Sequence, residues 1–171
     1  MQEEEKYGID IDNAHQKAIE LIPEDFFWSC FDELAPFGSD EGDTALAEFR
    51  EWRKENPATP TLECIKWVIE SVGEMEFADY NSEMLSRNKI KSQLEDENFD
   101  DQQYIYTLDN SVIATGFAQL VDEGLIEAEN KKIIQLAIDR QIIWAELSPG
   151  WEYSKKYISN LKILDRALKA S

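Results

Sequence analysis

The sequence contains little of the chemistry from which most active sites are built. Its 171 residues include one histidine, His15, and two cysteines, Cys30 and Cys64. A single histidine removes His-rich metal sites and most relays that pair a nucleophile with a histidine base. Glycine-rich phosphate-binding motifs are also missing. The sequence therefore favours a protein that is not an enzyme and that uses no cofactor and no metal.

No apolar run is long enough to cross a membrane. The longest, near Ile133 to Leu147, is interrupted by Asp139 and Arg140, whereas a membrane span needs about 20 apolar residues in succession. Residues 1–6 lack the basic and apolar regions of a secretory signal. We therefore expect no membrane partner, no export and a cytoplasmic location.

Acidic residues outnumber basic ones by 36 to 17, a net charge of −19. Residues 1–101 hold 27 acidic and 9 basic residues, so this part alone carries −18. Charge at this density destabilises a compact fold through self-repulsion, but it attracts cationic partners. It also repels nucleic acid. The composition therefore predicts a basic protein as the partner.

Apolar residues recur at helical spacing from end to end and predict seven helices. They are centred on residues 14–22, 26–34, 45–52, 62–72, 113–121, 133–147 and 153–168. Asp12 or Asn13 is expected to cap the first helix, and Thr59 the fourth, with Pro60 at its first position. Gly124 is expected to end the fifth.

Two segments are harder to assign. Residues 73–103 show weak periodicity and an acidic run, which predicts a frayed helix and an exposed loop. Residues 104–108 have a strand-like composition, but no second strand offers a partner, so helix or irregular structure is expected. The segment 128–147 is apolar on most sides and is expected to be a buried central helix. The predicted fold is all-α, a single compact domain over 1–171.

The few reactive groups have ordinary explanations. His15 is expected to be a surface or half-buried helix residue. Cys30 and Cys64 can pair in principle, but both lie on apolar stripes and are expected to be packed, reduced thiols. Among 36 acids, carboxylate pairs of the glycosidase type arise by chance. A calcium loop aligned on Gly42 places Phe37 at the first ligand position, which breaks that motif.

The loop from Pro36 to Asp43 is the most distinctive local feature, and it has two interpretations. In the structural one, proline and glycine turn the chain, and Ser39 or Asp40 caps the next helix. In the functional one, an acidic patch with aromatic anchors binds a partner through steering charge and buried rings. The residues of that patch are Glu24, Asp25, Trp28, Phe37, Asp40, Glu41 and Asp43. Trp28 and Phe37 are also compatible with a place in the core.

A small, very acidic, tryptophan-containing and helical protein without catalytic motifs resembles the bacterial immunity proteins, including those of contact-dependent growth inhibition systems. The resemblance is one of type across the whole chain. It implies tight binding to a cognate toxin domain encoded next to the gene, often a nuclease. The alternatives are an acidic adaptor or nucleic-acid mimic that binds a host nucleic-acid-binding protein, and an enzyme that uses a carboxylate pair.

Overall fold

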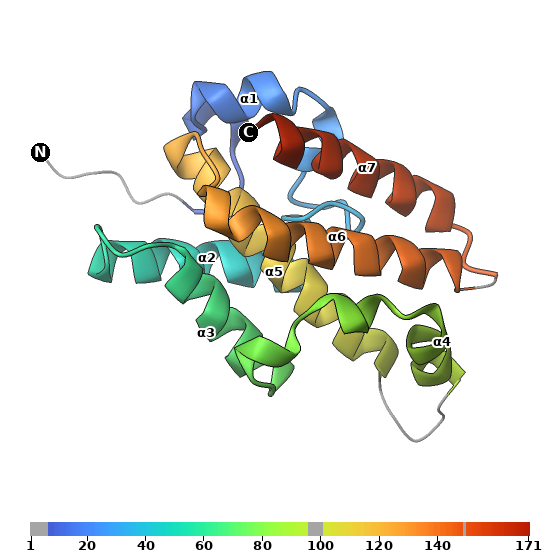
Figure 1. Cartoon of the computed structure of the whole chain (residues 1–171). Helices are drawn as coiled ribbons and strands as arrows, with labels where there is room; N and C mark the ends of the chain where they lie inside the picture. The colour runs from blue at the N-terminus through green and yellow to red at the C-terminus, as the bar shows by residue number, and fades with distance from the viewer. Residues whose placement is uncertain (1–6, 96–100, 149) are drawn as a thin grey trace, which may run out of the picture.

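The computed structural model describes residues 7–95, 101–148 and 150–171. Within these ranges the chain forms α-helices and short 3-10 helices but no strand (Figure 1). The seven α-helices are α1 (Gln16–Leu21), α2 (Asp40–Glu55), α3 (Leu62–Gly73), α4 (Arg87–Glu95), α5 (Asp101–Glu123), α6 (Lys131–Glu146) and α7 (Ser154–Ala170). The prediction of a single all-α domain with about seven helices is confirmed. None of the described helices combines the length and apolar character that a membrane span requires.

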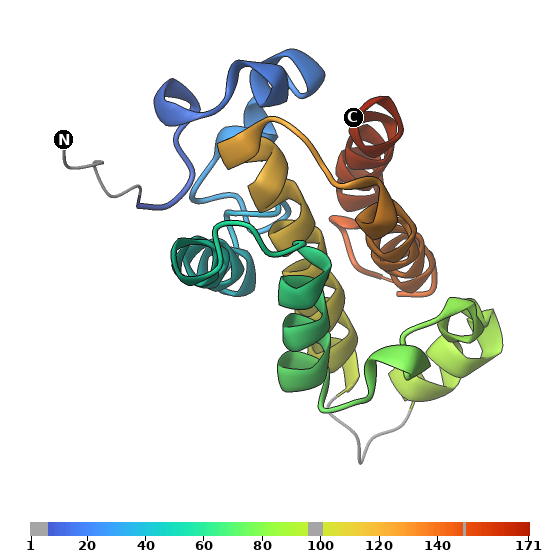
Figure 2. The ribbon, with the colours of Figure 1, turned by 60° about the vertical axis from the view of Figure 1, so that its left-hand side comes forward.

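Helix α5 forms the centre of the domain. It contacts α1, α2, α3, α4 and α6, and α7 packs against α6. Figure 2 shows α2 and α3 on one side of α5, with α6 and α7 on the other. Every residue from 108 to 121 is buried. The predicted helix near 128–147 is present as α6, which buries one face, but the central position belongs to α5.

Small residues allow the neighbouring helices to approach α5 closely. A Cβ atom added to Gly116 would lie 2.3 Å from Cδ1 of Ile134 on α6. The buried hydroxyl groups of Ser111 and Thr115 donate to carbonyl oxygens one turn earlier in α5, at 2.7 Å in both cases. These two hydroxyl groups are thus satisfied within α5 itself, which allows Ser111 and Thr115 to be buried without a partner on another helix.

A buried polar network joins α5 to α6 and α7. The Asp109 carboxylate accepts from Arg140 Nε at 2.6 Å, from Tyr80 Oη at 2.7 Å and from Gln141 Nε2 at 3.0 Å. Tyr157 Oη donates to Gln141 Oε1 at 2.6 Å. Burial, the main cause, raises the pKa of Tyr80 and of Tyr157 well above the ordinary value. These phenols therefore remain protonated donors in the network.

Several helix ends agree with the sequence predictions. The hydroxyl of Ser39 caps α2 by accepting from the Gly42 amide at 3.1 Å. Helix α2 ends at Glu55, with Asn56 as its C-cap. This end agrees with the one predicted from the proline-containing segment 56–60. Gly124 follows the last residue of α5 with a φ of +82°, and its amide donates to the Leu120 carbonyl at 2.9 Å. Left-handed glycines of this kind commonly end helices.

Two predicted caps are wrong. The N-cap of α1 is His15, whose Nδ1 accepts from the Lys17 amide at 3.1 Å, whereas Asp12 and Asn13 lie in the preceding 3-10 helix η1 (Ile11–Asn13). The N-cap of α3 is Thr61, two residues after the predicted Thr59. Both helices begin later in the chain than the predicted caps imply, at Gln16 and at Leu62.

The predicted helix over residues 26–34 is also wrong. The structure has only the 3-10 helix η2 (Asp25–Trp28), followed by turns held by Ser29 and Asp32 side chains. Phe27 enters the core, but Phe31 is 88% exposed and Cys30 is exposed. The expectation that Cys30 is packed therefore fails, whereas Cys64 is buried as expected. Helical spacing of apolar residues did not produce a helix here.

The segment of weak periodicity, which was predicted to be one frayed helix, contains three separate helical elements between residues 77 and 95. It contains η3 (Phe77–Asp79), η4 (Ser82–Leu85) and α4, in which Ile90 is buried. The expected acidic loop at 96–100 lies outside the described residues. Residues 104–108 belong to α5, which confirms helix in place of strand. The remaining 3-10 helix, η5 (Ala128–Asn130), leads into α6.

Candidate functional site

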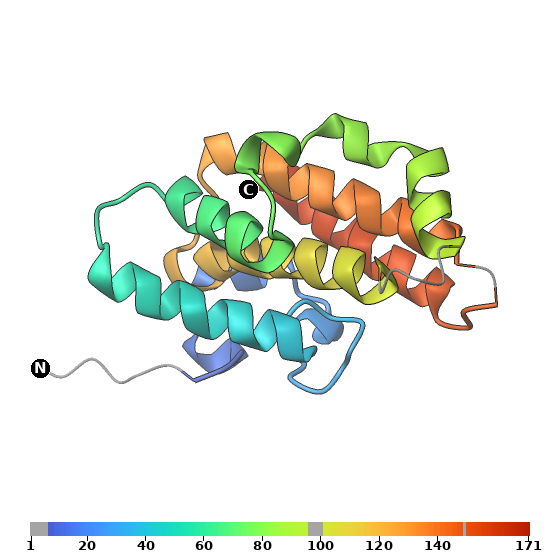
Figure 3. The same ribbon diagram turned by 90° about the horizontal axis from the view of Figure 1, so that it is seen from below.

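A surface cleft lies between α2 and α3, over α5. Its volume is about 270 Å³. Figure 3 shows α2 and α3 alongside α5 on the same side of the domain. We call this site the acidic cleft, and it is lined by Asp40, Glu41, Thr44, Ala45, Glu48, Val68, Val72, Thr107 and Ser111.

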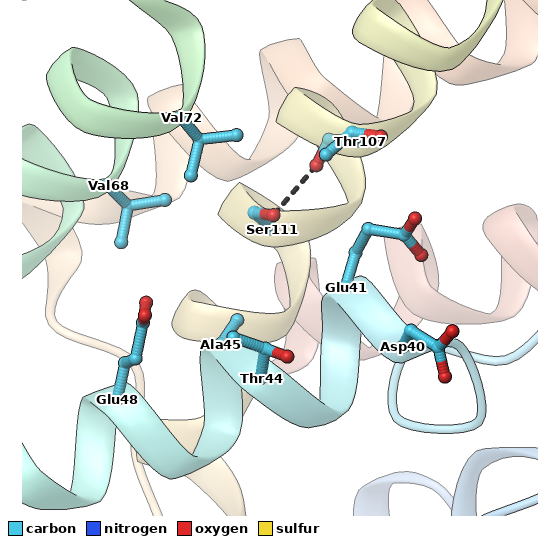
Figure 4. Close-up of a pocket in the computed structure, with 9 residues that line it drawn as sticks. All are labelled: Asp40, Glu41, Thr44, Ala45, Glu48, Val68, Val72, Thr107 and Ser111. Atoms are coloured by element: carbon cyan, nitrogen blue, oxygen red, sulfur yellow. Dashed lines mark hydrogen bonds between the residues drawn. The ribbon is translucent and has the colours of Figure 1, made fainter.

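The cleft has a different chemical character on each side. Helix α2 supplies the three carboxylates, Asp40, Glu41 and Glu48, and α3 supplies two valines. In Figure 4 the Glu48 side chain rises from α2 towards Val68, while Glu41 lies on the side of Thr107. None of these lining residues is basic. An acidic wall thus faces an apolar wall.

The amphipathic pattern of α2 and α3 builds this arrangement. Both helices bury one stripe against α5: Leu46 and Phe49 are at most 1% exposed on α2, and Ile65 and Ile69 are equally buried on α3. The lining residues lie at the edges of these stripes, where each helix surface turns from the core towards water. The cleft is therefore bounded by half-polar edges and closed below by α5.

The start of α2 is fixed tightly to the rest of the domain. A Cβ atom on Gly42 would lie 1.5 Å from the carbonyl oxygen of Pro36. The side-chain amide of Asn110 on α5 donates to the Ser39 hydroxyl at 2.6 Å. Asp40 and Glu41 follow directly, so their backbone is anchored to the central helix. Preorganised groups of this kind bind without a large ordering cost.

The distribution of ion pairs leaves the cleft carboxylates uncompensated. Arg50 of the acidic half pairs with Asp122 at 2.9 Å, and Arg53 pairs with Glu123 at 2.8 Å. Arg87 likewise pairs with Glu146 at 2.8 Å. These three arginines of residues 1–101 thus pair with acidic residues from the rest of the chain. Within the described residues, Asp40, Glu41 and Glu48 make no ion pair.

The negative field extends from the cleft into the adjacent packing. Burial, with a smaller contribution from Glu48, raises the pKa of the Cys64 thiol to about 12. Burial is also the main cause that raises the pKa of Tyr106 to about 12, and Glu41 adds to this rise. Both groups resist ionisation because the surroundings are apolar and already negative. The same negative field would stabilise a cation bound in the cleft.

The structure separates the residues that the sequence analysis grouped into one acidic patch. Asp40 and Glu41 line the cleft together. Asp43 is exposed on the other side of α2, where its Oδ1 would lie 3.7 Å from a Cβ on Gly8. Glu24 belongs to a different face, where its Oε1 accepts from Arg166 Nη2 of α7 at 2.6 Å. Asp25 is exposed at the start of η2.

The two proposed aromatic anchors have packing roles. Phe37 is 1% exposed, and its ring packs edge-on against Phe27 with the centroids 5.4 Å apart. It is therefore part of the core and is not available at the surface as a contact for a partner. Trp28 is half-buried, and its Nε1 donates to the carbonyl of Ile22 at 2.8 Å. The core interpretation of both residues is the one that their packing supports.

Most of the residues that line the cleft are not among those predicted from the sequence. Glu48 was overlooked, although it follows Glu41 by two helical turns on an amphipathic helix, a spacing that places the two on the same face. Val68 and Val72 were assigned to the core stripe of their helix. Thr107 and Ser111 come from α5, and nothing in the sequence places them beside α2. Trp67, 47% exposed and adjacent to Val68 in α3, was also not selected.

The other cluster of titratable side chains, around Asp109, is an internal structural network. Its carboxylate is completely buried and accepts from three side chains. Among the described residues there is no group of three or more histidine, cysteine, aspartate or glutamate side chains that could hold a metal ion.

The geometry of the acidic cleft suits binding of a cationic and partly apolar group.

Comparisons of the chain with family models, with curated proteins and with solved structures find no match.

Proposed function

We propose that this chain is a non-enzymatic acidic immunity protein that binds and neutralises a basic secreted bacterial toxin, with a nuclease as the favoured toxin class. The observation that carries the proposal is the acidic cleft, where Asp40, Glu41 and Glu48 stand opposite an apolar wall. It lies in the part of the chain that carries −18. In this proposal the protein acts in the cytoplasm of the producing cell.

The charge supports a nuclease as the toxin. Nucleases hold phosphates with cationic surfaces, and an acidic protein offers those surfaces a competing field. Electrostatic steering raises association rates by about 10- to 1000-fold at low salt. Protection against a toxin that acts quickly benefits from such a rate. Association of the two proteins is therefore expected to slow steeply as salt is added.

The apolar wall of the cleft favours a protein partner over a purely electrostatic one. Interfaces gain affinity mainly from buried apolar contacts, and charge contributes mainly specificity and association rate. Val68 and Val72 supply apolar surface beside the carboxylates. The alternative function, an acidic adaptor or nucleic-acid mimic that occupies a host nucleic-acid-binding protein, depends on the charge alone.

The test is co-expression of the chain with each toxin encoded next to its gene, followed by binding measurements with the purified toxin domain. We expect protection of the cell and a complex whose association rate falls with salt. Failure to bind or protect against every such toxin removes the proposal. Capture of a purified host nucleic-acid-binding protein with no effect on the toxins would instead support the adaptor or mimic.

A matched pair of variants shows whether the cleft is the contact. The double variant Glu41→Lys with Glu48→Lys reverses the cleft charge, and Asp79→Lys with Glu83→Lys makes the same charge change at exposed positions elsewhere. We expect the cleft variant to associate at least about tenfold more slowly than the control variant. At physiological salt, an exposed charge acts mainly on groups within a Debye length of about 8 Å, so the charges next to the contact decide the rate. Equal rates would place the contact outside the cleft.

A further inference from the structure

The acidic cleft has a defined order of groups along α2. Glu41 and Glu48 are seven residues apart, which corresponds to about 10 Å, or two helical turns. Between them lies Ala45, which is 3% exposed and shares the cleft with Val68 and Val72 of the facing helix. The cleft therefore presents an acid, an apolar contact and a second acid in sequence.

The size of the cleft decides what can enter it. Its volume of about 270 Å³ corresponds to roughly nine water molecules at ~30 Å³ each. An α-helix with its side chains is about 10 Å across, so a whole helix does not fit. One or two side chains do. Lysine and arginine suit the mixed walls, because an aliphatic stem can lie on the valines while the charged head reaches a carboxylate.

The two-turn spacing distinguishes between partner conformations. In an extended strand, about 10 Å corresponds to three residues, and side chains three residues apart point to opposite faces. A strand therefore has no pair of same-face residues whose separation matches that of Glu41 and Glu48. In a helix aligned with α2, side chains seven residues apart return to the same face. The spacing of Glu41 and Glu48 matches a helical partner.

We propose that the acidic cleft binds a basic amphipathic helix of the partner, which lies across the mouth of the cleft and inserts side chains into it. The helix carries two lysine or arginine residues seven positions apart, opposite Glu41 and Glu48. An apolar residue three or four positions after the first cation packs against Val68 and Val72. This inference rests on the proposed function, and it identifies the segment of the toxin that is recognised.

The probe is a synthetic helical peptide of about 15 residues, the length at which isolated helices become stable. It carries lysines seven positions apart with leucine between them. The matched control peptide has the same composition and net charge, permuted so that the lysines lie on different faces. We expect the patterned peptide to bind the full chain at least about tenfold more tightly, because steering by net charge acts equally on both peptides.

Variants of the chain locate the binding at the cleft. Thr44 is exposed and lines the cleft, so Thr44→Arg fills the mouth with a competing cation. Ala47→Arg adds the same charge at an exposed position of α2 outside the lining. We expect at least a tenfold loss of peptide affinity for Thr44→Arg and at most a twofold loss for Ala47→Arg. Circular dichroism and thermal unfolding verify that both variants are folded.

Neutral substitutions test each carboxylate separately. Partly exposed ion pairs contribute modestly, so we expect Glu41→Gln and Glu48→Gln each to weaken the patterned peptide by about two- to fivefold. Asp43→Asn, which removes one charge on the other side of α2, should leave its affinity unchanged. Equal binding of the two peptides, or equal effects of Glu48→Gln and Asp43→Asn, overturns the inference.

The same variants separate this inference from the proposed function. A toxin that is still neutralised by Thr44→Arg as well as by the unmodified chain shows that immunity stands and the cleft is not the contact. Selective binding of the patterned peptide, together with no protection against any neighbouring toxin, shows that the cleft recognises basic helices but that the immunity function is wrong.

Discussion

Replacing Asp109 by asparagine tests the buried polar network that holds α5, α6 and α7 together. The Asp109 carboxylate is 0% exposed, and the paired Arg140 side chain is 7% exposed. Asparagine preserves the shape but removes the negative charge that faces the buried guanidinium of Arg140. Removing one partner of a buried ion pair costs about 3–5 kcal/mol. Domains of this kind have a free energy of unfolding of about 5–15 kcal/mol.

We therefore expect Asp109→Asn to remove about a fifth or more of the stability. For a chain of this length each kcal/mol lowers Tm by about 2–4 °C, so the expected fall is roughly 6–20 °C. Urea unfolding followed by circular dichroism gives the free energy. Asp79→Asn, at an exposed position, is the control and should change it by less than about 0.5 kcal/mol.

A double-mutant cycle tests whether the two side chains act as a pair. Removing both charges, with Asp109→Leu and Arg140→Met, should cost less than the sum of the two single changes, because no unpaired charge then stays buried. A loss below about 1 kcal/mol for Asp109→Asn, or additive effects in the cycle, would refute the interpretation that the ion pair supports the core.

Three further outcomes are expected. Cys30 should react with a thiol reagent in the folded protein and Cys64 only on unfolding, because burial raises the pKa of Cys64 to about 12; reaction of both at the same rate would contradict this. Gly42→Ala should lower the free energy of unfolding by about 1–3 kcal/mol through overpacking at the start of α2, even though alanine is the better helix former; a gain in stability in urea unfolding would contradict the close contact. Burial opposes ionisation of Glu127, but hydrogen bonds from Thr61 outweigh this and lower the pKa of Glu127 in the fold. Its contribution is therefore present above the unfolded pKa of about 4.3 and is lost as pH falls through the folded pKa, so the stability difference between the unmodified chain and Glu127→Gln should shrink below pH 4; a difference independent of pH would be inconsistent with this linkage.

The excess of acid over base shapes the surface through the way in which charges are paired. Arginines of the acidic half are drawn to Asp122 and Glu123 near the end of α5, where they fix α2 to the central helix. These pairs stabilise the contact between helices but leave the acids of the outer helices facing water. Self-repulsion on that face is thus the cost of a surface that attracts cations.

Local signals in the sequence were sufficient for the amphipathic surface helices. Helices α2, α3 and α7 each bury one clear stripe, as in the buried Tyr157, Leu161 and Leu164 of α7. Periodicity reveals such helices because only one of their faces meets the core. Gly124 and Ser39 marked helix ends through backbone conformation and side-chain capping, which depend on neighbours in sequence alone.

Periodicity predicted only the second half of α5, over 113–121, and it was misleading where a loop supplied the apolar residues. Helix α5 is enclosed on every side, so polar residues such as Asp109 and Gln119 lie in the core with partners from other elements. The first half of α5 consequently lacks the one-sided apolar stripe that identifies a helix. Phe27 and Phe31 have helical spacing, yet one is in the core and the other is 88% exposed. Only the path of the surrounding loop decides between them.

The sequence by itself determined that the chain is helical, that it is strongly acidic in its first hundred residues, and that Asp40 and Glu41 begin a helix. These properties depend on composition, spacing and local capping. The tertiary structure alone decided that Glu24, Asp43 and Phe37 lie apart from the cleft and that Glu48, Val68 and Ser111 belong to it. The physical reason is that a cleft forms where separate helices diverge, and their packing on α5 depends on contacts between residues far apart in the chain.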